Sequence, residues 1–125
     1  FKKRWGRIGD SPVIGAGTYA DNNSCAVSCT GHGEYFIRHA VAFDVCARYK
    51  YLKESVEKAA DYIIHTELNT NAGNGGLIAV DKLGNIAMPY NSGGMFRGFL
   101  YKEKGSPEIK KGCGIGKKIV VVGEK

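Results

Sequence analysis

Two groups of strand-like segments, separated by two helix-like segments, constrain the fold of this chain more than any other feature of its 125 residues. Apolar residues recur at three- and four-residue steps from Glu34 to about Tyr49 and again from Lys53 to His65, as in amphipathic helices. No helix-like segment lies between consecutive strands of either group. This order predicts an α+β protein rather than a doubly wound parallel sheet. The predicted strands are residues 13–20, 25–31, 77–81, 85–90 and 95–101, with turns at residues 21–23 and 82–84.

The net charge of +6 is unevenly distributed along the chain. Residues 1–10 carry +3 and residues 101–125 carry +4, whereas residues 11–100 sum to −1. A nucleic-acid-binding face usually gathers basic side chains on a structured surface, so solvated ends are the favoured interpretation and no nucleic-acid partner is expected. No window of 18 uncharged apolar residues occurs, so no membrane-spanning segment is expected either.

The four cysteines, Cys25, Cys29, Cys46 and Cys113, show neither C-x-x-C spacing nor a nearby pair of histidines. A zinc site is therefore not expected, and buried free thiols are the favoured interpretation. If residues 25–29 form a strand, Cys25 and Cys29 lie about 13 Å apart, which is too far for a disulfide. Cysteine usage leaves the cellular compartment open.

The segment "GRIGDSP" (residues 6–12) places Arg7 and Asp10 three residues apart in what should be a tight turn. A guanidinium matches a carboxylate and an aspartate accepts from an amine, so the two together suit a ligand that carries both groups. The alternative is that Arg7 and Asp10 simply pair with each other. These seven residues alone favour that alternative.

The segment "TGHGE" (residues 30–34) joins a predicted strand directly to a predicted helix. The Thr30 hydroxyl and the Gly31 N–H could donate together to a developing oxyanion, and Gly31 and Gly33 would allow a substrate to approach the backbone. The alternative makes Thr30 a helix cap, with glycines in the turn and Glu34 as a first-turn acid. Taken alone, this segment favours the cap.

Taken together, "GRIGDSPVIGAGTYAD", "TGHGE" and "GGLIAVDKLGNIAMPYNSGGMFRG" closely resemble the β subunit of plant-type L-asparaginases. These enzymes are also isoaspartyl aminopeptidases and belong to the N-terminal-nucleophile hydrolases. The resemblance covers residues 4 to about 100. Glycosylasparaginases share the first two motifs, whereas "MPYNSGGMFRG" is similar to the isoaspartyl branch. The resemblance implies hydrolysis of L-asparagine or β-aspartyl peptides, with no cofactor and no metal.

The resemblance also implies roles for individual residues. Arg7 corresponds to the arginine that holds the substrate α-carboxylate, and Asp10 to the aspartate that takes the α-ammonium group. Thr30 and the Gly31 N–H correspond to the oxyanion hole. The Gly31 carbonyl and Gly33 correspond to backbone contacts around the substrate amine. His32 stands at a position that varies in the family, and no role is expected for it.

One departure from the family concerns the nucleophile. In the family, the β subunit begins with a threonine whose hydroxyl attacks the substrate and whose α-amine, with a reference pKa of about 8, can act as the base. This chain begins with Phe1, and Thr18, Thr66 and Thr70 stand in the wrong contexts. Three explanations are open: a partial β subunit, a relative that has lost catalysis, or an unrelated fold such as a small basic binding module.

The resemblance implies the β-subunit half of an αββα sandwich, with residues 1–100 forming the asparaginase-like region and residues 101–125 a basic C-terminal extension. Its expected partners are the α subunit of the same precursor and a second αβ unit. Alone, the chain should expose the sheet face that meets the α subunit. In the extension, residues 119–122 after Lys117 and Lys118 could add an edge strand, and a disordered basic tail is the equal alternative.

Overall fold

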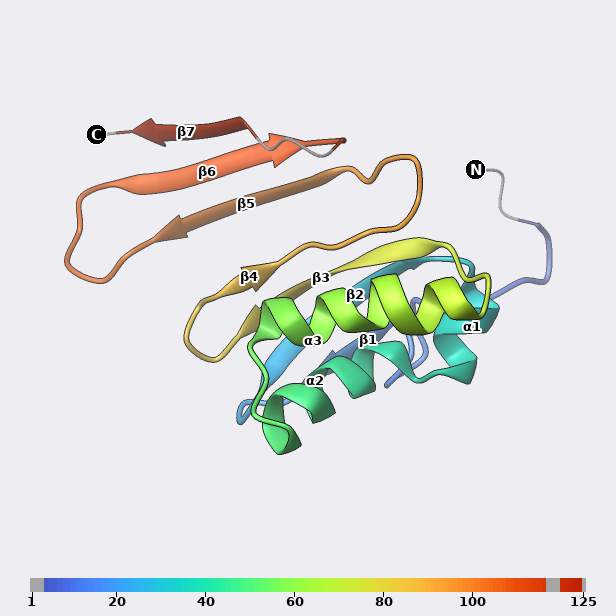
Figure 1. Ribbon diagram of the computed structural model, residues 1–125. Coiled ribbons are helices and arrows are strands. Elements are labelled where there is room, and N and C mark those ends of the chain that lie inside the picture. The colour runs from blue at the N-terminus through green and yellow to red at the C-terminus, as the bar shows by residue number, and fades with distance from the viewer. Residues whose placement is uncertain (1–3, 117–119, 125) are drawn as a thin grey trace. The chain divides into compact units, whose positions relative to one another are not determined.

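The computed structural model describes the backbone of residues 4–116 and 120–124, and side chains as far as residue 116. The chain divides into two compact units, residues 1–91 and 92–125, and each is described by itself. Both units are built on antiparallel sheets, and the first unit adds helices (Figure 1). The predicted α+β class is therefore confirmed.

The sheet of the first unit has four antiparallel strands in the order β1-β2-β3-β4. Side chains along β2 alternate between the two faces, so that Cys25, Val27 and Cys29 are buried while Ala26 and Ser28 are exposed. The buried face carries the core, and the other face is open. The strands are β1 (Thr18–Ala20), β2 (Cys25–Gly31), β3 (Gly75–Asp81) and β4 (Ile86–Ala87).

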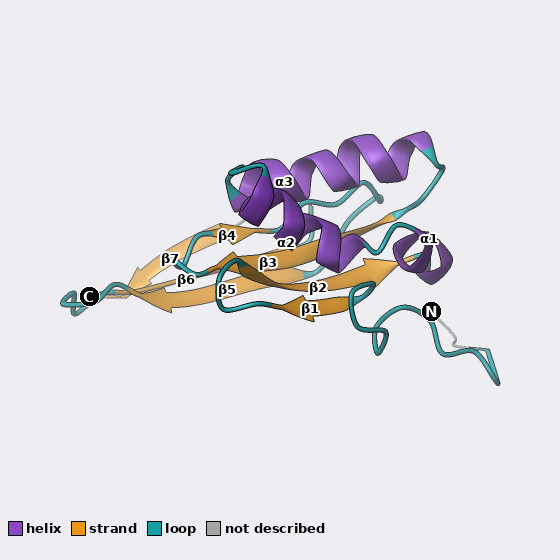
Figure 2. Ribbon diagram, turned by 90° about the horizontal axis from the view of Figure 1, so that it is seen from below, coloured by secondary structure: helices purple, strands orange, loops and turns teal. Residues whose placement is uncertain are grey.

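Helices cover one face of this sheet (Figure 2). Val45 and Ile63 of the predicted apolar stripes are buried and pack with Leu77 of β3 in one hydrophobic core. Ile37 and Leu52, which were also expected on these stripes, are exposed. The helical elements are α1 (Gly33–Arg38), α2 (Val41–Tyr51), α3 (Val56–Tyr62) and the π-helical turn η1 (Ile63–Leu68), which continues α3.

The sequence predicts a single helix from Glu34 to about Tyr49, and this prediction is wrong in one respect. The structure has two helices there, α1 and α2, separated by residues 39–40. Ala40 adopts a left-handed conformation with φ of 45°. The first N–H groups of α2 then donate to another part of the chain: Ala42 to the Ala16 carbonyl at 3.0 Å and Phe43 to the Gly15 carbonyl at 2.9 Å. These contacts supply acceptors for the unpaired N–H groups of the helix end.

The same contacts explain why the strand predicted over residues 13–20 is shorter than expected. Only Thr18–Ala20 forms β1, whereas residues 13–17 form turns whose carbonyls meet the start of α2. The second helix also starts later than the predicted Lys53. It starts at Val56, because the Ser55 side chain accepts from the Lys58 N–H at 3.2 Å as an N-cap.

The predicted hairpin turn at residues 82–84 is confirmed between β3 and β4. Asp81 holds it: its Oδ1 accepts from the Leu83 and Asn85 N–H groups at 2.8 and 2.9 Å. Burial raises the pKa of Asp81, but these hydrogen bonds outweigh it and leave the pKa below its usual value. The strand predicted over residues 85–90 is limited to Ile86–Ala87.

The second unit is a three-stranded antiparallel sheet in the order β5-β6-β7. β5 (Arg97–Lys102) begins two residues later than the predicted strand, and β6 (Ile109–Gly114) was not predicted. β7 (Val120–Glu124) lies at the sheet edge and pairs with β6, which confirms the edge strand over the disordered tail. Lys117 and Lys118 lie outside the described residues.

Candidate active site

The turn that carries Arg7 and Asp10 lies against the start of α1. Arg7 donates from Nη2 to Glu34 Oε2 at 2.8 Å, and both side chains are about half exposed, at 52% and 56%. Among the described residues Arg7 therefore forms its ion pair with Glu34, and the alternative in which Arg7 pairs with Asp10 is not observed. No hydrogen bond or ion pair with Arg7 occupies the Asp10 carboxylate among the described residues.

Gly33 brings the two sequence motifs into direct contact. A Cβ added at Gly33 would lie 2.9 Å from the Asp10 nitrogen and 3.1 Å from Asp10 Oδ1. From the other side, a Cβ at Gly17 would overlap the Asp10 carbonyl. The Asp10 turn is thus held between two glycines, and only residues without a side chain allow this approach.

Asp10 is buried, with a relative exposure of 5%, and its Oδ2 has no hydrogen-bond partner within the described part of the chain. Burial raises the pKa of Asp10, and the nearby Glu34 charge adds to this. A backbone hydrogen bond and the Arg7 charge act in the opposite direction but do not outweigh burial. A buried carboxylate oxygen without a partner is costly, so this side chain is well suited to accept a cationic donor from a ligand.

Thr30 and Gly31 stand at the end of β2, opposite Gly76 and Gly75 of β3 respectively. The chains approach so closely here that a Cβ at Gly31 would lie 2.7 Å from Gly75 Cα, and the Phe36 ring fills the space beside them. Thr30 itself is exposed. The alternative role for Thr30 as a helix cap is contradicted, because His32 is the N-cap of α1 and makes no side-chain capping bond.

Asn91, for which no role was predicted, organises the backbone behind this glycine pair. Its Oδ1 accepts from the Gly75 N–H at 2.8 Å, and its backbone N–H donates to the Gly75 carbonyl at 2.9 Å. Its Nδ2 donates to Asn69 Oδ1 at 2.8 Å and to the Gly73 carbonyl at 2.9 Å. Asn91 thereby fixes the loop that faces Thr30 and Gly31.

Replacing Gly75 by alanine should strongly destabilise the fold. The new Cβ would overlap the Thr30 carbonyl oxygen and lie 2.8 Å from Gly31 Cα, and backbone atoms cannot move aside as a flexible side chain would. We expect a loss of about 3 kcal/mol or more in the free energy of unfolding, measured by urea denaturation. Gly93→Ala is the matched control, because no described atom beyond its two chain neighbours lies within 4 Å of the added Cβ. Equal stability of the two variants would contradict the close approach.

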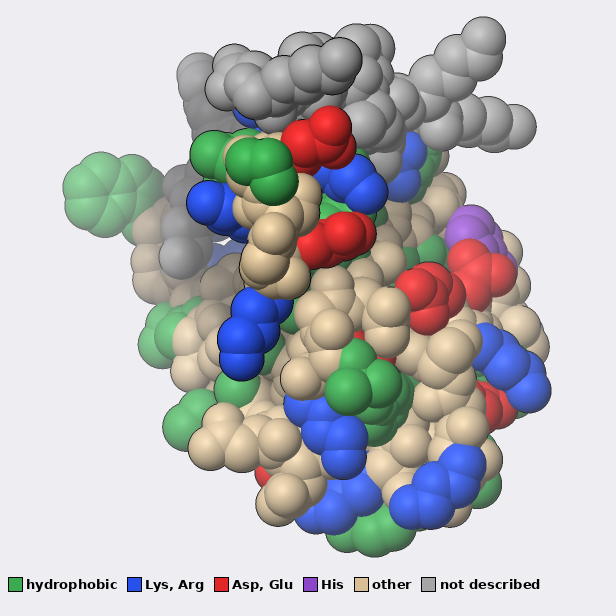
Figure 3. All heavy atoms as spheres, turned by 90° about the vertical axis from the view of Figure 1, so that its left-hand side faces the viewer, with side chains coloured by type: hydrophobic (Ala, Val, Ile, Leu, Met, Phe, Trp, Pro, Cys, Tyr) green, Lys and Arg blue, Asp and Glu red, His purple; other side chains and the backbone are tan. Residues whose placement is uncertain are grey.

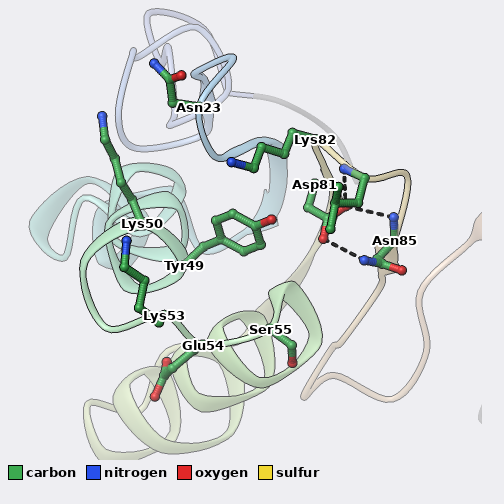
Figure 4. Close-up of a pocket in the computed structure, with 10 residues that line it drawn as sticks. Asn23, Tyr49, Lys50, Lys53, Glu54, Ser55, Asp81, Lys82 and Asn85 are labelled. Atoms are coloured by element: carbon green, nitrogen blue, oxygen red, sulfur yellow. Dashed lines mark hydrogen bonds between the residues drawn. The ribbon is translucent and has the colours of Figure 1, made fainter.

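A second feature, an open pocket of about 450 Å³, lies at the opposite end of the sheet (Figure 4). Asp81, in its wall, pairs with Cys25 at one end of the β2–β3 ladder, whereas Gly75 pairs with Gly31 at the other. The six-residue separation amounts to about 20 Å. The pocket is lined by Asn23, Tyr49, Lys50, Lys53, Glu54, Ser55, Asp81, Lys82, Leu83 and Asn85.

The charged groups of this pocket are largely engaged in structural contacts. Asp81 holds the hairpin turn, Lys50 pairs with Asp21 at 3.1 Å, and Glu54 lies 3.6 Å from both Arg48 and Lys58. The end of the molecule seen in Figure 3 carries Lys and Arg side chains interspersed with Asp and Glu. The pocket therefore shows no arrangement of acid, base and nucleophile that competes with the site around Asp10.

Membrane-spanning helices and metal clusters are two further features that bear on function. No helix in that part of the chain combines the length and apolarity needed to cross a membrane. No cluster of three or more His, Cys, Asp or Glu side chains that could hold a metal ion was found there.

Comparison of the sequence with known proteins places the chain in a family. The model of the family described as Asparaginase matches residues 1–109. The chain belongs to the asparaginase family. It is 51% identical over 96 residues to the isoaspartyl peptidase of Salmonella typhimurium, covering 77% of this chain and 31% of that protein. Over 110 residues it is 46% identical to the isoaspartyl peptidase of Escherichia coli, with shares of 80% and 34%.

A plant relative is similar in sequence over nearly the same share of the chain. The chain is 51% identical over 98 residues to the probable isoaspartyl peptidase/L-asparaginase 2 of Arabidopsis thaliana, covering 78% of this chain and 29% of that protein. The predicted membership of this hydrolase family, and its relation to isoaspartyl peptidases, are thus confirmed. The chain spans about a third of the length of these relatives, so the activity of the whole protein is a separate question.

Proposed function

We propose that this chain is the β-subunit-like part of an amidohydrolase that cleaves L-asparagine and β-aspartyl peptides. In this proposal the chain supplies the substrate clamp and the oxyanion hole. The observation that carries it is the contact of Gly33 with Asp10, which brings the "GRIGDSP" and "TGHGE" motifs together around a buried, unpartnered carboxylate oxygen.

In the clamp, Asp10 accepts from the substrate α-ammonium group and Arg7 binds the α-carboxylate. The unpartnered Asp10 Oδ2 supports the first role, because an ammonium donor would satisfy it. The Arg7 side chain is half exposed and held at its far end by Glu34. A surface ion pair of this kind contributes little, about 0–1 kcal/mol, so a substrate carboxylate can compete for the guanidinium.

The oxyanion hole consists of the Thr30 hydroxyl and the Gly31 N–H. Both stand at the exposed end of β2. In this proposal the Gly31 carbonyl and Gly33 make the backbone contacts around the substrate amine. Donors fixed by a strand end cost little to reorganise when charge develops on the substrate oxygen. The rigid pairing of Gly31 with Gly75, held by Asn91, supports such fixed positions.

The nucleophile in this proposal is an N-terminal threonine contributed by sequence outside these 125 residues. Of the chain's four threonines, Thr30 and Thr18 belong to segments that contact Asp10, through Gly33 and Gly17, and both lie within strands rather than at an N-terminus. Thr70 donates its hydroxyl to the Thr66 carbonyl at 2.7 Å, at the end of the helical segment. The free α-amine of a threonine can take the proton of its own hydroxyl, so no further base is needed.

The proposed assembly is the αββα sandwich of N-terminal-nucleophile hydrolases, with this chain as its β-subunit half. The helices already cover one face of the four-stranded sheet (Figure 2). On the other face Ile78 and Val80 are 47% and 45% exposed. Apolar side chains on an open sheet face favour burial against a partner, for which we propose the α subunit of the same precursor, followed by dimerisation of αβ units.

Weak binding of L-aspartate tests the clamp, with calorimetry as the measurement. Arg7→Ala should abolish binding, whereas Lys82→Ala, which removes a cation at the other end of the sheet, should not change it. Asp10 must be ionised to accept an ammonium group, and burial raises its pKa. Affinity should therefore be constant above that raised pKa and fall about tenfold per pH unit below it. Binding that survives Arg7→Ala, or shows no such decline at low pH, would contradict the clamp.

A further inference from the structure

Cys25 and Cys46 meet in the core of the first unit. Cys25 begins β2 and Cys46 lies in the middle of α2, and their relative exposures are 3% and 2%. Their sulfur atoms are 2.8 Å apart, and the Cys46 thiol also donates to the Cys25 carbonyl at 3.2 Å. All four cysteines of the chain are in the free thiol form.

The distance between the two sulfurs is short for atoms that are not bonded. Nonbonded carbon atoms, which are smaller than sulfur, settle at about 3.5–4.0 Å, whereas a disulfide places its sulfurs at about 2.05 Å. The two thiols therefore need to approach by less than one ångström to bond. We propose that Cys25 and Cys46 are a disulfide-forming pair that links β2 covalently to α2 when the chain meets a disulfide oxidant such as oxidised glutathione.

The thiol–disulfide exchange with oxidised glutathione takes two steps. The Cys46 thiolate attacks one sulfur of oxidised glutathione, forms a mixed disulfide and releases one glutathione thiolate. The Cys25 thiolate then attacks the Cys46 sulfur and releases the second glutathione, so two protons and two electrons leave the protein. The hydrogen bond with the Cys25 thiol lowers the pKa of Cys46 despite burial, which favours Cys46 as the first nucleophile. Access to the buried pair requires local opening of α2 against the sheet.

The other two cysteines are not placed for this reaction. Cys29 lies four residues further along β2, about 13 Å from Cys25, and burial raises its pKa. Cys113 belongs to the second unit and is exposed. The Cys25–Cys46 bond would enclose the segment that contains Thr30, Gly31 and Gly33. The bond would thereby restrain the proposed oxyanion hole. The proposed disulfide does not depend on whether the protein hydrolyses amides.

Mass spectrometry of the unreduced chain tests the pair. The 125-residue protein with Cys113→Ser is incubated with oxidised glutathione in native buffer and, in parallel, in urea, then blocked with iodoacetamide and digested with trypsin. Cys25 and Cys29 share the tryptic peptide 8–38, and Cys46 lies in peptide 39–48. We expect the cross-linked pair of peptides in native buffer. In urea the closer pair, Cys25 and Cys29, should dominate within peptide 8–38.

Matched variants identify the sulfurs. The link between the two peptides should persist in Cys29→Ser and disappear in both Cys25→Ser and Cys46→Ser. The oxidised protein should also melt at least about 5 °C above its reduced form, because the bond closes a loop of some twenty residues. A link no more abundant in native buffer than in urea, or one that survives in Cys25→Ser, would overturn the proposal.

Discussion

In an assay with L-asparagine or a β-aspartyl dipeptide, the 125-residue chain alone is expected to show no hydrolysis. Activity is expected only when the α subunit and a segment with an N-terminal threonine are restored. Amide hydrolysis of this type needs a nucleophile, an oxyanion hole and a clamp on the zwitterionic end of the substrate. The chain supplies candidates for the last two, in Thr30 and Gly31 and in Arg7 and Asp10, but none of its threonines is placed as an N-terminal nucleophile.

The control for this reconstitution replaces only the N-terminal threonine of the restored segment by valine, which keeps the shape and removes the hydroxyl. That variant should assemble like the active one, as judged by its size in solution, and release no ammonia. Turnover by the isolated 125-residue chain would contradict the assignment. The search for another nucleophile would then begin with Thr30, which belongs to the proposed site.

The sequence predicted those parts of the fold that depend on local patterns. Apolar periodicity identified β2, β3 and the helical region, and turn-forming residues identified the β3–β4 hairpin. The break at Ala40 could not be predicted, because its cause is tertiary: the start of α2 donates to the Gly15 and Ala16 carbonyls. β6 was missed because its run "IKKGCG" holds a single β-branched residue, Ile109, and no aromatic residue, whereas strands are usually rich in both.

The candidate site likewise combines features that the sequence predicted with features that only tertiary contacts determine. The motifs indicated which residues belong to it, yet the partner of Arg7 proved to be Glu34 rather than Asp10. The sequence also could not reveal that Gly33 packs on Asp10, or that Asn91 fixes Gly75 opposite Gly31. Such contacts join residues 16 or more positions apart, and their geometry is set by the sheet and helix around them. Resemblance identified the motifs, and only the fold shows how they meet.

Thr30→Ala in the reconstituted enzyme should lower kcat by about 10²–10³-fold, the usual cost of removing one oxyanion donor. KM should change little, because the hydroxyl acts chiefly on charge that develops in the transition state. Arg7→Ala should do the reverse and raise KM strongly, because it removes a contact made before the chemical step. Steady-state kinetics over a range of substrate concentrations should therefore show a change chiefly in kcat for Thr30→Ala and chiefly in KM for Arg7→Ala.

Ser28→Ala is the matched control for Thr30→Ala. Ser28 lies two residues earlier on β2, on the same exposed side of the strand, so its substitution also removes one hydroxyl from that face. It should leave both kcat and KM within about twofold of the parent, since no substrate oxygen lies near it in the proposed site. A role of Thr30 in capping α1 would lower the stability rather than kcat, but His32 occupies that cap. If Thr30→Ala instead raised KM and left kcat unchanged, the hydroxyl would belong to substrate binding, and Gly31 would remain as the only proposed oxyanion donor from this chain.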